Sequence, residues 1–136
     1  MTDSDRESID VVRKRTGKLG EQIACSFLSR NGYEIVEKNF RRKWGEIDII
    51  ALKANSVRFV EVKAATQRKF SREMHHQPEE MVDARKLRKL ARTAALYMEA
   101  TKDGREYQID VVAVILNEAT RTARCRLIEQ ALEDNL

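Results

Sequence analysis

Apolar residues recur at helical spacing near the start of the chain. From residue 17 onward they form one stripe, made of Leu19, Ile23, Ala24, Phe27 and Leu28. A stripe of this kind predicts a helix that buries one face. The Asn-Gly pair at 31–32 ends the helix, because glycine accepts the positive φ of a helix stop. Residues 1–16 show no sustained period, so we expect a flexible polar tail there and a single domain over residues 17–136.

Three extended segments follow this helix, at residues 33–40, 45–51 and 57–63. The first alternates moderately between apolar and polar residues, and the other two alternate clearly. The short polar segment at 53–56 lies between the second and the third. Its length favours a β-hairpin, which makes these two strands antiparallel neighbours.

Alternation along the two clear strands assigns each residue to a face of the sheet. In the earlier strand, one face is expected to hold Ile47, Ile49 and Ala51. The opposite face is expected to hold Glu46, Asp48 and Ile50. In the later strand, one face is expected to hold Phe59, Glu61 and Lys63, and the other Val60 and Val62. Two carboxylates, on Asp48 and Glu61, therefore come from adjacent strands.

The second half of the chain predicts a loop, a helix and a buried strand. Residues 64–78 are polar and are expected to form the loop. Residues 79–100 form an amphipathic helix whose apolar face holds Leu87, Leu90, Ala91, Ala94, Tyr97 and Met98. Residues 107–116 are almost all apolar, which is typical of a central strand, and residues 124–132 form an edge strand or a short helix. The resulting order, αβββαβ, predicts an α/β fold with a mixed central sheet flanked by helices.

Composition and charge narrow the class of protein. Hydrophobic residues make up 42% of the chain and charged residues 35%, an ordinary balance for a soluble domain. The apolar runs are too short to span a membrane, and the polar, acid-containing start does not resemble a targeting segment, so we expect a cytoplasmic protein. The two cysteines, Cys25 and Cys125, lack metal-ligand spacing and are expected to be free structural thiols.

The net charge is only +4, but basic residues are concentrated in the middle of the chain. One group precedes the second strand and consists of Arg41, Arg42 and Lys43. The other lies on the second helix, with Arg85, Arg88, Lys89 and Arg92 on the polar face and Lys86 on the border between the two faces. This distribution is compatible with a nucleic-acid partner, although solvated helix faces also carry such charges.

The two strand carboxylates suggest a specific chemistry. Asp48 and Glu61 can hold a hard divalent cation such as Mg²⁺ or Mn²⁺, and the backbone carbonyl of Val62 can add a further ligand. Lys63, on the same face as Glu61, can orient a water molecule or bind a phosphate. Together these groups meet the needs of phosphodiester hydrolysis. The alternative is an exposed sheet edge on which Glu61 and Lys63 are ordinary solvated residues.

The two strand motifs also resemble a known family. The segments Gly-Glu-Ile-Asp-Ile-Ile-Ala at 45–51 and Phe-Val-Glu-Val-Lys at 59–63 are similar to those of the YraN-like family of uncharacterised bacterial proteins. That family is placed in the restriction-endonuclease-like, PD-(D/E)XK, nuclease superfamily and resembles archaeal Holliday-junction resolvases. The resemblance extends over about residues 17–116, and it implies the restriction-endonuclease-like αβββαβ core and a nuclease-like domain.

The resemblance also implies roles for individual residues. Asp48 and Glu61 would be metal ligands and Lys63 the catalytic lysine, while Glu21 would be a helix acid that joins the metal site. For Glu21, an acid favoured by the helix dipole in the first turn remains an equal alternative. The implied activity is a metal-dependent endonuclease acting on DNA, including branched or structured DNA in repair and recombination. By analogy with the resolvases, the resemblance implies a homodimer.

Two features leave the function open at this stage. Ala65 stands where relatives usually carry a basic residue, so a phosphate contact is missing and a catalytically weak or inactive nucleic-acid-binding module is the alternative function. Trp44 follows the basic residues 41–43 and could stack on a nucleobase or pack into the core.

Overall fold

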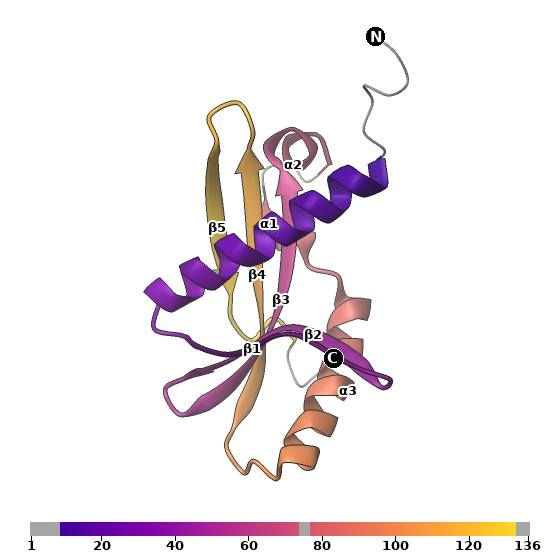
Figure 1. The fold of residues 1–136 in the computed structure, drawn as a ribbon, viewed down its shortest axis with the longest axis vertical. Helices are drawn as coiled ribbons and strands as arrows, with labels where there is room; N and C mark the ends of the chain where they lie inside the picture. Colours follow the sequence, from indigo (N-terminus) through magenta and orange to yellow (C-terminus); the bar gives the residue numbers. More distant parts are fainter. Residues whose placement is uncertain (1–8, 74–76, 133–136) are drawn as a thin grey trace.

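A mixed five-stranded sheet with the strand order β1-β2-β3-β4-β5 forms the centre of the protein. The computed structural model describes residues 9–73 and 77–132 (Figure 1). Its elements, in chain order, are α1 (Ile9–Arg30), β1 (Glu34–Arg42), β2 (Gly45–Lys53), β3 (Ser56–Thr66), α2 (Gln67–Glu73), the 3-10 helix η2 (Pro78–Met81), α3 (Ala84–Thr101), β4 (Tyr107–Asn117) and β5 (Thr122–Ile128).

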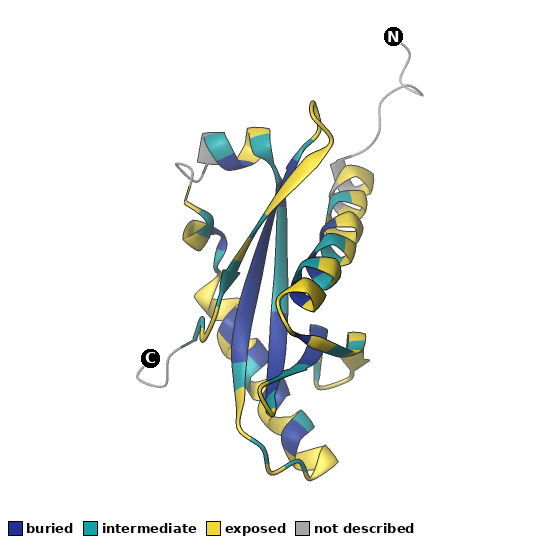
Figure 2. Ribbon diagram, turned by 90° about the vertical axis from the view of Figure 1, so that its left-hand side faces the viewer, coloured by how far each residue is buried: buried dark blue, intermediate teal, exposed yellow. Residues whose placement is uncertain are grey.

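Strands β3 and β4 run parallel, and every other neighbouring pair is antiparallel. The chain returns from β3 to β4 through α3, as a parallel pair requires a crossover. Helix α1 lies on one face of the sheet, and α2 and α3 lie on the other (Figures 1 and 2). The predicted α/β class, with an αβββαβ order and a mixed sheet flanked by helices, is confirmed. Of residues 124–132, those up to Ile128 belong to the edge strand β5, and the described residues after it form a turn rather than a helix.

Helix α1 begins at Ile9, so the prediction of a flexible tail over residues 1–16 is wrong for residues 9–16. This first part of α1 carries exposed residues such as Val11 and Val12, whose side chains are 48% and 39% exposed. Exposed apolar residues such as these set no hydrophobic period in the sequence, so the pattern did not reveal this part of the helix. Residues 1–8 lie outside the described part of the chain.

The segment predicted as a loop at 64–78 is largely structured. Strand β3 continues to Thr66, α2 follows directly, and Pro78 opens η2. The second long helix begins at Ala84 rather than at residue 79, because the carboxylate of Asp83 caps it by accepting the backbone N–H groups of Arg85 and Lys86 at 3.0 and 3.3 Å. The acids before Asp83 belong to η2, which has its own short hydrogen-bonded turn.

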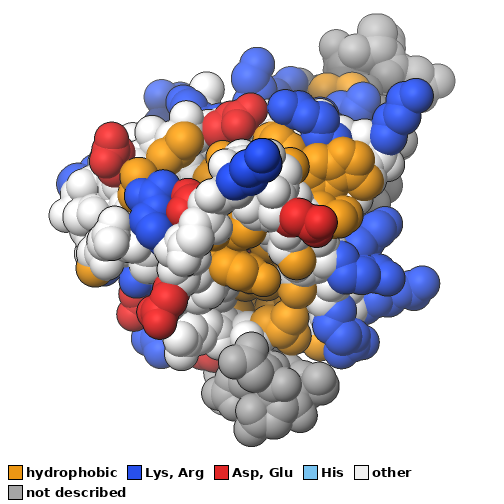
Figure 3. Space-filling model, turned by 90° about the horizontal axis from the view of Figure 1, so that it is seen from below, with side chains coloured by type: hydrophobic (Ala, Val, Ile, Leu, Met, Phe, Trp, Pro, Cys, Tyr) orange, Lys and Arg blue, Asp and Glu red, His pale blue; other side chains and the backbone are white. Residues whose placement is uncertain are grey.

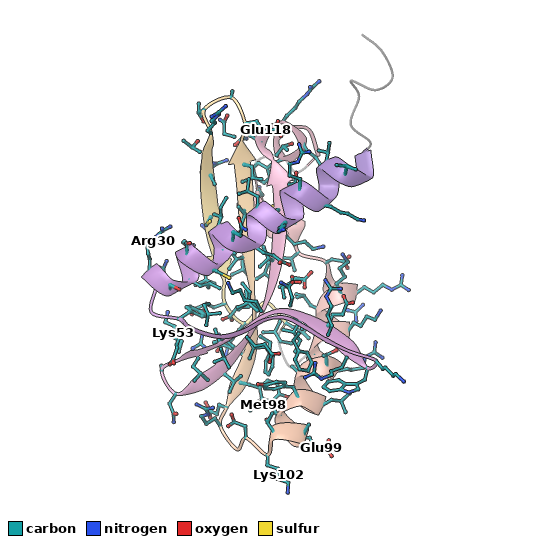
Figure 4. All side chains as sticks on the ribbon, viewed as in Figure 1. Arg30, Lys53, Met98, Glu99, Lys102 and Glu118 are labelled. Carbon is teal, nitrogen blue, oxygen red and sulfur yellow. The ribbon has the colours of Figure 1, made fainter. Side chains whose placement is uncertain are left out.

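The core lies in two main layers, one on each face of the sheet. On the face covered by α3, Phe40, Val57, Phe59 and Val111 pack with the apolar side of that helix, and Figure 4 shows side chains filling the space between the β1–β2 hairpin and α3. On the face covered by α1, the buried residues include Ala24, Leu28, Ile49, Val60 and Val112. The predicted apolar face of α3 and the predicted alternation of β3 are confirmed. The predicted face of α1 is confirmed for Ile23, Ala24, Phe27 and Leu28, but Leu19 is wrong, because it is 44% exposed.

Strand β2 does not alternate as predicted. Ile47 packs with Ile50 on the α3 side, whereas Ile49 and Ala51 pack on the α1 side. The strand changes the face it presents around Asp48. In the neighbouring strand β1, Asn39 lies at the same level and has a positive φ of 52°. A register shift between Ile35 and Glu37 lies further along this strand, opposite Ile50 and Ala51. Such irregularities bend and twist a strand pair, which breaks the two-residue period.

A buried polar cluster holds the opposite end of the central strands. Arg58 of β3 and the fully buried Asp110 of β4 form an ion pair at 3.4 Å, and the hydroxyl of Tyr33 donates to Asp110 at 2.8 Å. Glu129, beyond β5, accepts from Arg58 at 3.3 Å. Since buried charges are tolerated when they are paired and hydrogen-bonded, this cluster fixes the register of the parallel pair away from the candidate site.

Two expectations from composition can be compared with the structure. Cys25 and Cys125 are free, and both are partly buried against the α1-side core. Among the described helices, none is both long and apolar enough to cross a membrane.

Helix α1 crosses β3 at an unusually close distance. The crossing point is Gly20, where an added Cβ atom would lie 2.5 Å from the Cβ of Ala64. Glycine costs about 1 kcal/mol relative to alanine inside a helix, so its presence here is explained by the need for close approach. The next residue in the helix is Glu21, and the close crossing therefore determines how near this carboxylate comes to the sheet.

We expect Gly20→Ala to lower the free energy of unfolding by about 1–3 kcal/mol, because the new methyl group overpacks the contact with Ala64. Gly17→Ala is the matched control, since a Cβ atom added there would have no atom within 4 Å. At that position the gain in helix propensity should raise stability by up to about 1 kcal/mol. Urea unfolding measures both, and equal stabilisation by the two variants would contradict the close crossing.

Candidate active site

Strands β2 and β3 part at the level of Asp48. They pair from Lys53 and Ser56 to Ile49 and Val60, and the described pairing ends there. Beyond this point β3 remains paired with β4 on its other side. A carboxylate oxygen of Asp48 accepts the backbone N–H of Val62 at 2.8 Å, so a side chain satisfies the donor that a continued ladder would have satisfied. The gap between the strands is the centre of the candidate site.

Glu61 lies on the α3 side of this gap, with 20% of its side chain exposed. Its carboxyl group is within hydrogen-bonding distance of Asp48. Burial and then the negative charge of Asp48 raise the pKa of Glu61 to about 7, and the positive charges of Lys63 and Lys86 only partly offset this. Two carboxylates held this close favour a shared proton or a cation between them.

Lys63 completes the predicted group from β3. Its ammonium nitrogen is 3.9 Å from a Glu61 oxygen, and 24% of its side chain is exposed. Burial and then the hydrogen bond and positive charge of Lys86, which extends from α3, lower the pKa of Lys63, while the same hydrogen bond raises the pKa of Lys86. Lys63 therefore gives up its proton more readily than Lys86 does.

Glu21 approaches Asp48 from the opposite face of the sheet. Its pKa is raised by burial and then by the charge of Asp48, and hydrogen bonds from Asn39 and the charge of Arg41 act in the other direction. Glu21 therefore contacts Asp48 from the α1 side of the sheet, and Glu61 contacts the same residue from the α3 side. The alternative of an ordinary first-turn acid is excluded by position, because α1 begins twelve residues earlier in the chain, at Ile9.

Two cavities meet at Asp48. The larger has a volume of about 590 Å³ and is lined by Arg42, Lys43, Trp44, Gly45, Glu46, Asp48, Glu61, Lys86, Lys89, Leu90 and Thr93. The smaller, of about 170 Å³, lies on the α1 side and includes Lys18, Glu21, Asn39 and Asp48 in its lining. We call the larger one the α3 groove. Asp48 is therefore reached from both faces of the sheet.

The structure brings only some of the predicted basic residues to the site. Four line the α3 groove: Arg42, Lys43, Lys86 and Lys89. Arg41 instead forms an exposed ion pair with Glu46 at 3.1 Å. The remaining three, Arg85, Arg88 and Arg92, are exposed on α3 and do not line the groove. In Figure 3, Lys and Arg side chains are concentrated along the right-hand edge, the side on which the tip of the β1–β2 hairpin and α3 lie in Figure 1.

The donor atoms in the gap suit a hard divalent cation. Two carboxylates, from Asp48 and Glu61, lie within hydrogen-bonding distance of each other. In an extended strand the C=O and N–H of one residue point to the same edge, so the Val62 carbonyl faces the same gap as its N–H. Mg²⁺ is commonly held by one or two carboxylates and keeps several waters. Among the described residues no three His, Cys, Asp or Glu side chains are grouped as a metal site.

Two features of the site were not assigned from the sequence. Asn39 was placed in a strand without a role, yet it hydrogen-bonds Glu21 and has a positive φ of 52°. An asparagine in the middle of an alternating segment was the available signal, since Asn tolerates this conformation better than most residues. The sequence places Lys86 among the basic residues compatible with a nucleic-acid partner, but its contact with Lys63 depends on the docking of α3, which no local pattern encodes.

Ala65 lies in an apolar part of the structure. Ala65 is 5% exposed and packs with Phe70, Met81, Ala113 and Ile115. It lies one pleat beyond Lys63, where α2 covers the sheet. At this position the chain has apolar packing in place of a charge directed at the site.

Comparison with known proteins identifies relatives along most of the chain. The family model described as "Uncharacterised protein family UPF0102" matches residues 20–114. The chain is 43% identical over 109 residues to UPF0102 protein TTE1452 of Caldanaerobacter subterraneus subsp. tengcongensis, covering 79% of this chain and 84% of the relative. It is 38% identical over 122 residues to a UPF0102 protein of Moorella thermoacetica, covering 89% of this chain and 98% of the relative. The matched span includes every acid and lysine of the gap.

The raised pKa of Glu61 predicts a pH-dependent stability. This side chain titrates near 4.5 in the unfolded chain and near 7 in the fold, so the folded state binds more protons between these values and stability falls as pH rises through them. Glu61→Gln removes the effect. In EDTA it should exceed the wild-type stability by about 2–3 kcal/mol at pH 8 and match it at pH 4.

Urea unfolding at the two pH values checks this prediction. Glu34→Gln, at an exposed position of β1, is the control and should change stability by less than about 0.5 kcal/mol at either pH. A Glu61→Gln variant that is less stable than the wild type at pH 8 would show that the charged carboxylate is not disfavoured by the fold.

Proposed function

The chain belongs to the UPF0102 family, the YraN-like family that its motifs resemble, and we propose that it is a divalent-metal-dependent nuclease that hydrolyses DNA phosphodiesters. One observation carries the proposal. Where β2 and β3 part, the carboxylates of Asp48 and Glu61 are brought within hydrogen-bonding distance, and the ammonium of Lys63 lies 3.9 Å from Glu61. Burial and the nearby charge of Asp48 make the ionised form of Glu61 unfavourable, and ionisable groups perturbed in this way are common at sites that do chemistry.

Asp48, Glu61 and the Val62 carbonyl would hold the cation. When bound, a divalent cation neutralises negative charge at the phosphate and lowers the pKa of a bound water, which makes that water a better nucleophile. Glu21 would position Asp48 from the α1 side through their direct contact. A cation bound there would favour the ionised form of Glu61, because it opposes the effects of burial and of the Asp48 charge that raise the pKa of this group.

Lys63 would act on the phosphate or on the attacking water. It is partly buried, so its interactions with charge are less screened than those of a surface lysine. Lys86 sits beside it and keeps a positive charge at the same place when Lys63 gives up a proton. The pair therefore provides one cation for the substrate and one group able to accept a hydrogen bond from water.

The α3 groove would hold the DNA backbone. Arg42, Lys43 and Lys89 line it together with the two acids. Lysine and arginine contacts to phosphate position a nucleic acid without reading its sequence, and they make binding strongly dependent on salt. This supports a structure-selective or non-specific enzyme rather than one that recognises a fixed sequence.

We expect the purified protein to cleave DNA in Mg²⁺ or Mn²⁺, and Asp48→Asn, Glu61→Gln and Lys63→Met each to reduce the rate by about 100-fold or more, since each removes a group that stabilises the transition state. The measurement is cleavage of labelled linear, flapped, forked and four-way DNA. Glu34→Gln, away from the groove, should cleave like the wild type. Salt-sensitive binding without cleavage would overturn the nuclease and select the alternative, an inactive nucleic-acid-binding module.

Metal binding can be tested without DNA. Mg²⁺ or Mn²⁺ should raise the melting temperature of the wild type at pH 7.5, because a ligand that binds only the folded state stabilises it. At a free cation concentration of 100 times Kd the stabilisation is about 2.7 kcal/mol. Glu61→Gln should lose most of this shift, and Glu34→Gln should keep it. An equal shift in Glu61→Gln, measured by differential scanning calorimetry, would place the bound cation elsewhere.

A further inference from the structure

Trp44 stands at the tip of the β1–β2 hairpin, with 42% of its surface exposed. This exposure excludes the alternative of a core tryptophan. The ring contacts Phe40, with the two centroids 5.6 Å apart and the planes tilted by 59°, so one side is supported by the edge of the core. The residue also lines the α3 groove together with Asp48 and Glu61. An apolar ring is therefore presented beside the candidate catalytic acids.

The position of this ring is fixed by the packing of the hairpin against α3. A Cβ atom on the neighbouring Gly45 would overlap the side chain of Thr93. Thr93 is 2% exposed, and its hydroxyl donates to the backbone carbonyl of Lys89 at 3.2 Å. The backbone next to Trp44 thus rests directly on α3, and the ring is held at the groove before any ligand binds. Preorganisation of this kind reduces the cost of binding.

The surroundings of Trp44 match the chemistry of a nucleotide. Arg42 and Lys43 precede it in the hairpin, and Lys86 and Lys89 face it from α3 within the same groove lining. The cations can bind the phosphate, and the face of the indole ring can stack on a nucleobase. Such stacking does not depend on sequence, because every base has a flat aromatic face. The volume of about 590 Å³ lies within the usual range of about 300–1,000 Å³ for small-ligand sites, so the groove has room for a nucleotide.

A base inside a duplex is covered on both faces by its neighbours. It can stack on a protein side chain only when it is unpaired or displaced, which costs a few kcal/mol in intact duplex. An aromatic ring beside a hydrolytic centre therefore favours DNA in which the nucleotide near the scissile phosphate is already single-stranded.

We propose that Trp44 stacks on an unpaired base of the DNA, and that the protein consequently selects substrates with a single-stranded segment, such as flaps and forks, over continuous duplex. The proposal rests on the proposed function for the position of the scissile phosphate. The stacking itself is a binding property and can be measured in the absence of cleavage.

Trp44 is the only tryptophan of the chain, so intrinsic fluorescence reports on it alone. The Glu61→Gln protein in EDTA is titrated with a single-stranded oligonucleotide, with the same strand carrying abasic positions, and with a blunt duplex. The intact single strand should quench the fluorescence. The abasic strand should bind with little quenching, and the duplex should raise the anisotropy of a labelled end without quenching.

Variants of Trp44 separate stacking from a general loss of binding. Trp44→Ala should weaken single-strand binding by about 10-fold or more and duplex binding much less, and Trp44→Phe should restore part of the difference. Tyr107→Ala is the matched control, because Tyr107 is also 42% exposed but packs on Phe59 outside the groove lining. The Tyr107→Ala variant should prefer single-stranded over duplex DNA to the same extent as the protein without this substitution.

The outcomes distinguish the two proposals. Equal quenching by duplex and single strand, an unchanged single-strand preference in Trp44→Ala, or no DNA binding would overturn the stacking. Quenching that depends on intact bases, together with no cleavage by the wild type in Mg²⁺ or Mn²⁺, would support the stacking and overturn the nuclease. Cleavage of flapped DNA in preference to duplex, lost in Trp44→Ala, supports both.

Discussion

The separation of β2 from β3 at Asp48 is the constraint on which the rest of the site depends. A continued ladder would bury the backbone of Val62 and close the sheet. Instead, the Asp48 carboxylate accepts the Val62 N–H at 2.8 Å, which satisfies the donor while leaving a gap open to both faces. Through this gap Glu21 reaches Asp48 from α1, and Glu61 approaches from the side of α3. One acid from α1 and one from β3 therefore meet at the side chain of Asp48.

Packing elsewhere holds these charges close together. Burial is the first cause of the raised pKa of Glu61 and of the lowered pKa of Lys63, and the like charges of Asp48 and Lys86 act in the same direction. Two tight contacts oppose their separation: Gly20 of α1 against Ala64, and Gly45 of the hairpin against Thr93 of α3. The stability comes from apolar layers on each face of the sheet, and the gap is built where those layers end.

Local sequence patterns predicted the parts of the fold that have a continuous apolar face. The buried side of α3 and the alternation of β3 followed from period alone, so Glu61 and Lys63 were placed correctly on one face. Hydrophobic periodicity gave wrong predictions where a segment has no continuous apolar face, or where the apolar residues switch from one face of the strand to the other. The exposed start of α1 shows no stripe, and Ile47 packs opposite to Ile49 because the strand twists around Asp48. The bend that misled the alternation is the same bend that opens the site.

By itself the sequence determined the chemistry available to this protein: two strand acids one hairpin apart, a lysine two residues after the second, and basic residues nearby. Residue types and spacing along one strand are local properties, and they survive in any fold that keeps the strand. The tertiary structure decided which groups meet. Lys86 contacts Lys63, Glu21 contacts Asp48, and Trp44 lines the groove rather than the core, because these pairs join elements distant along the chain. Only the docking of α1 and α3 against the parted strands fixes their distances.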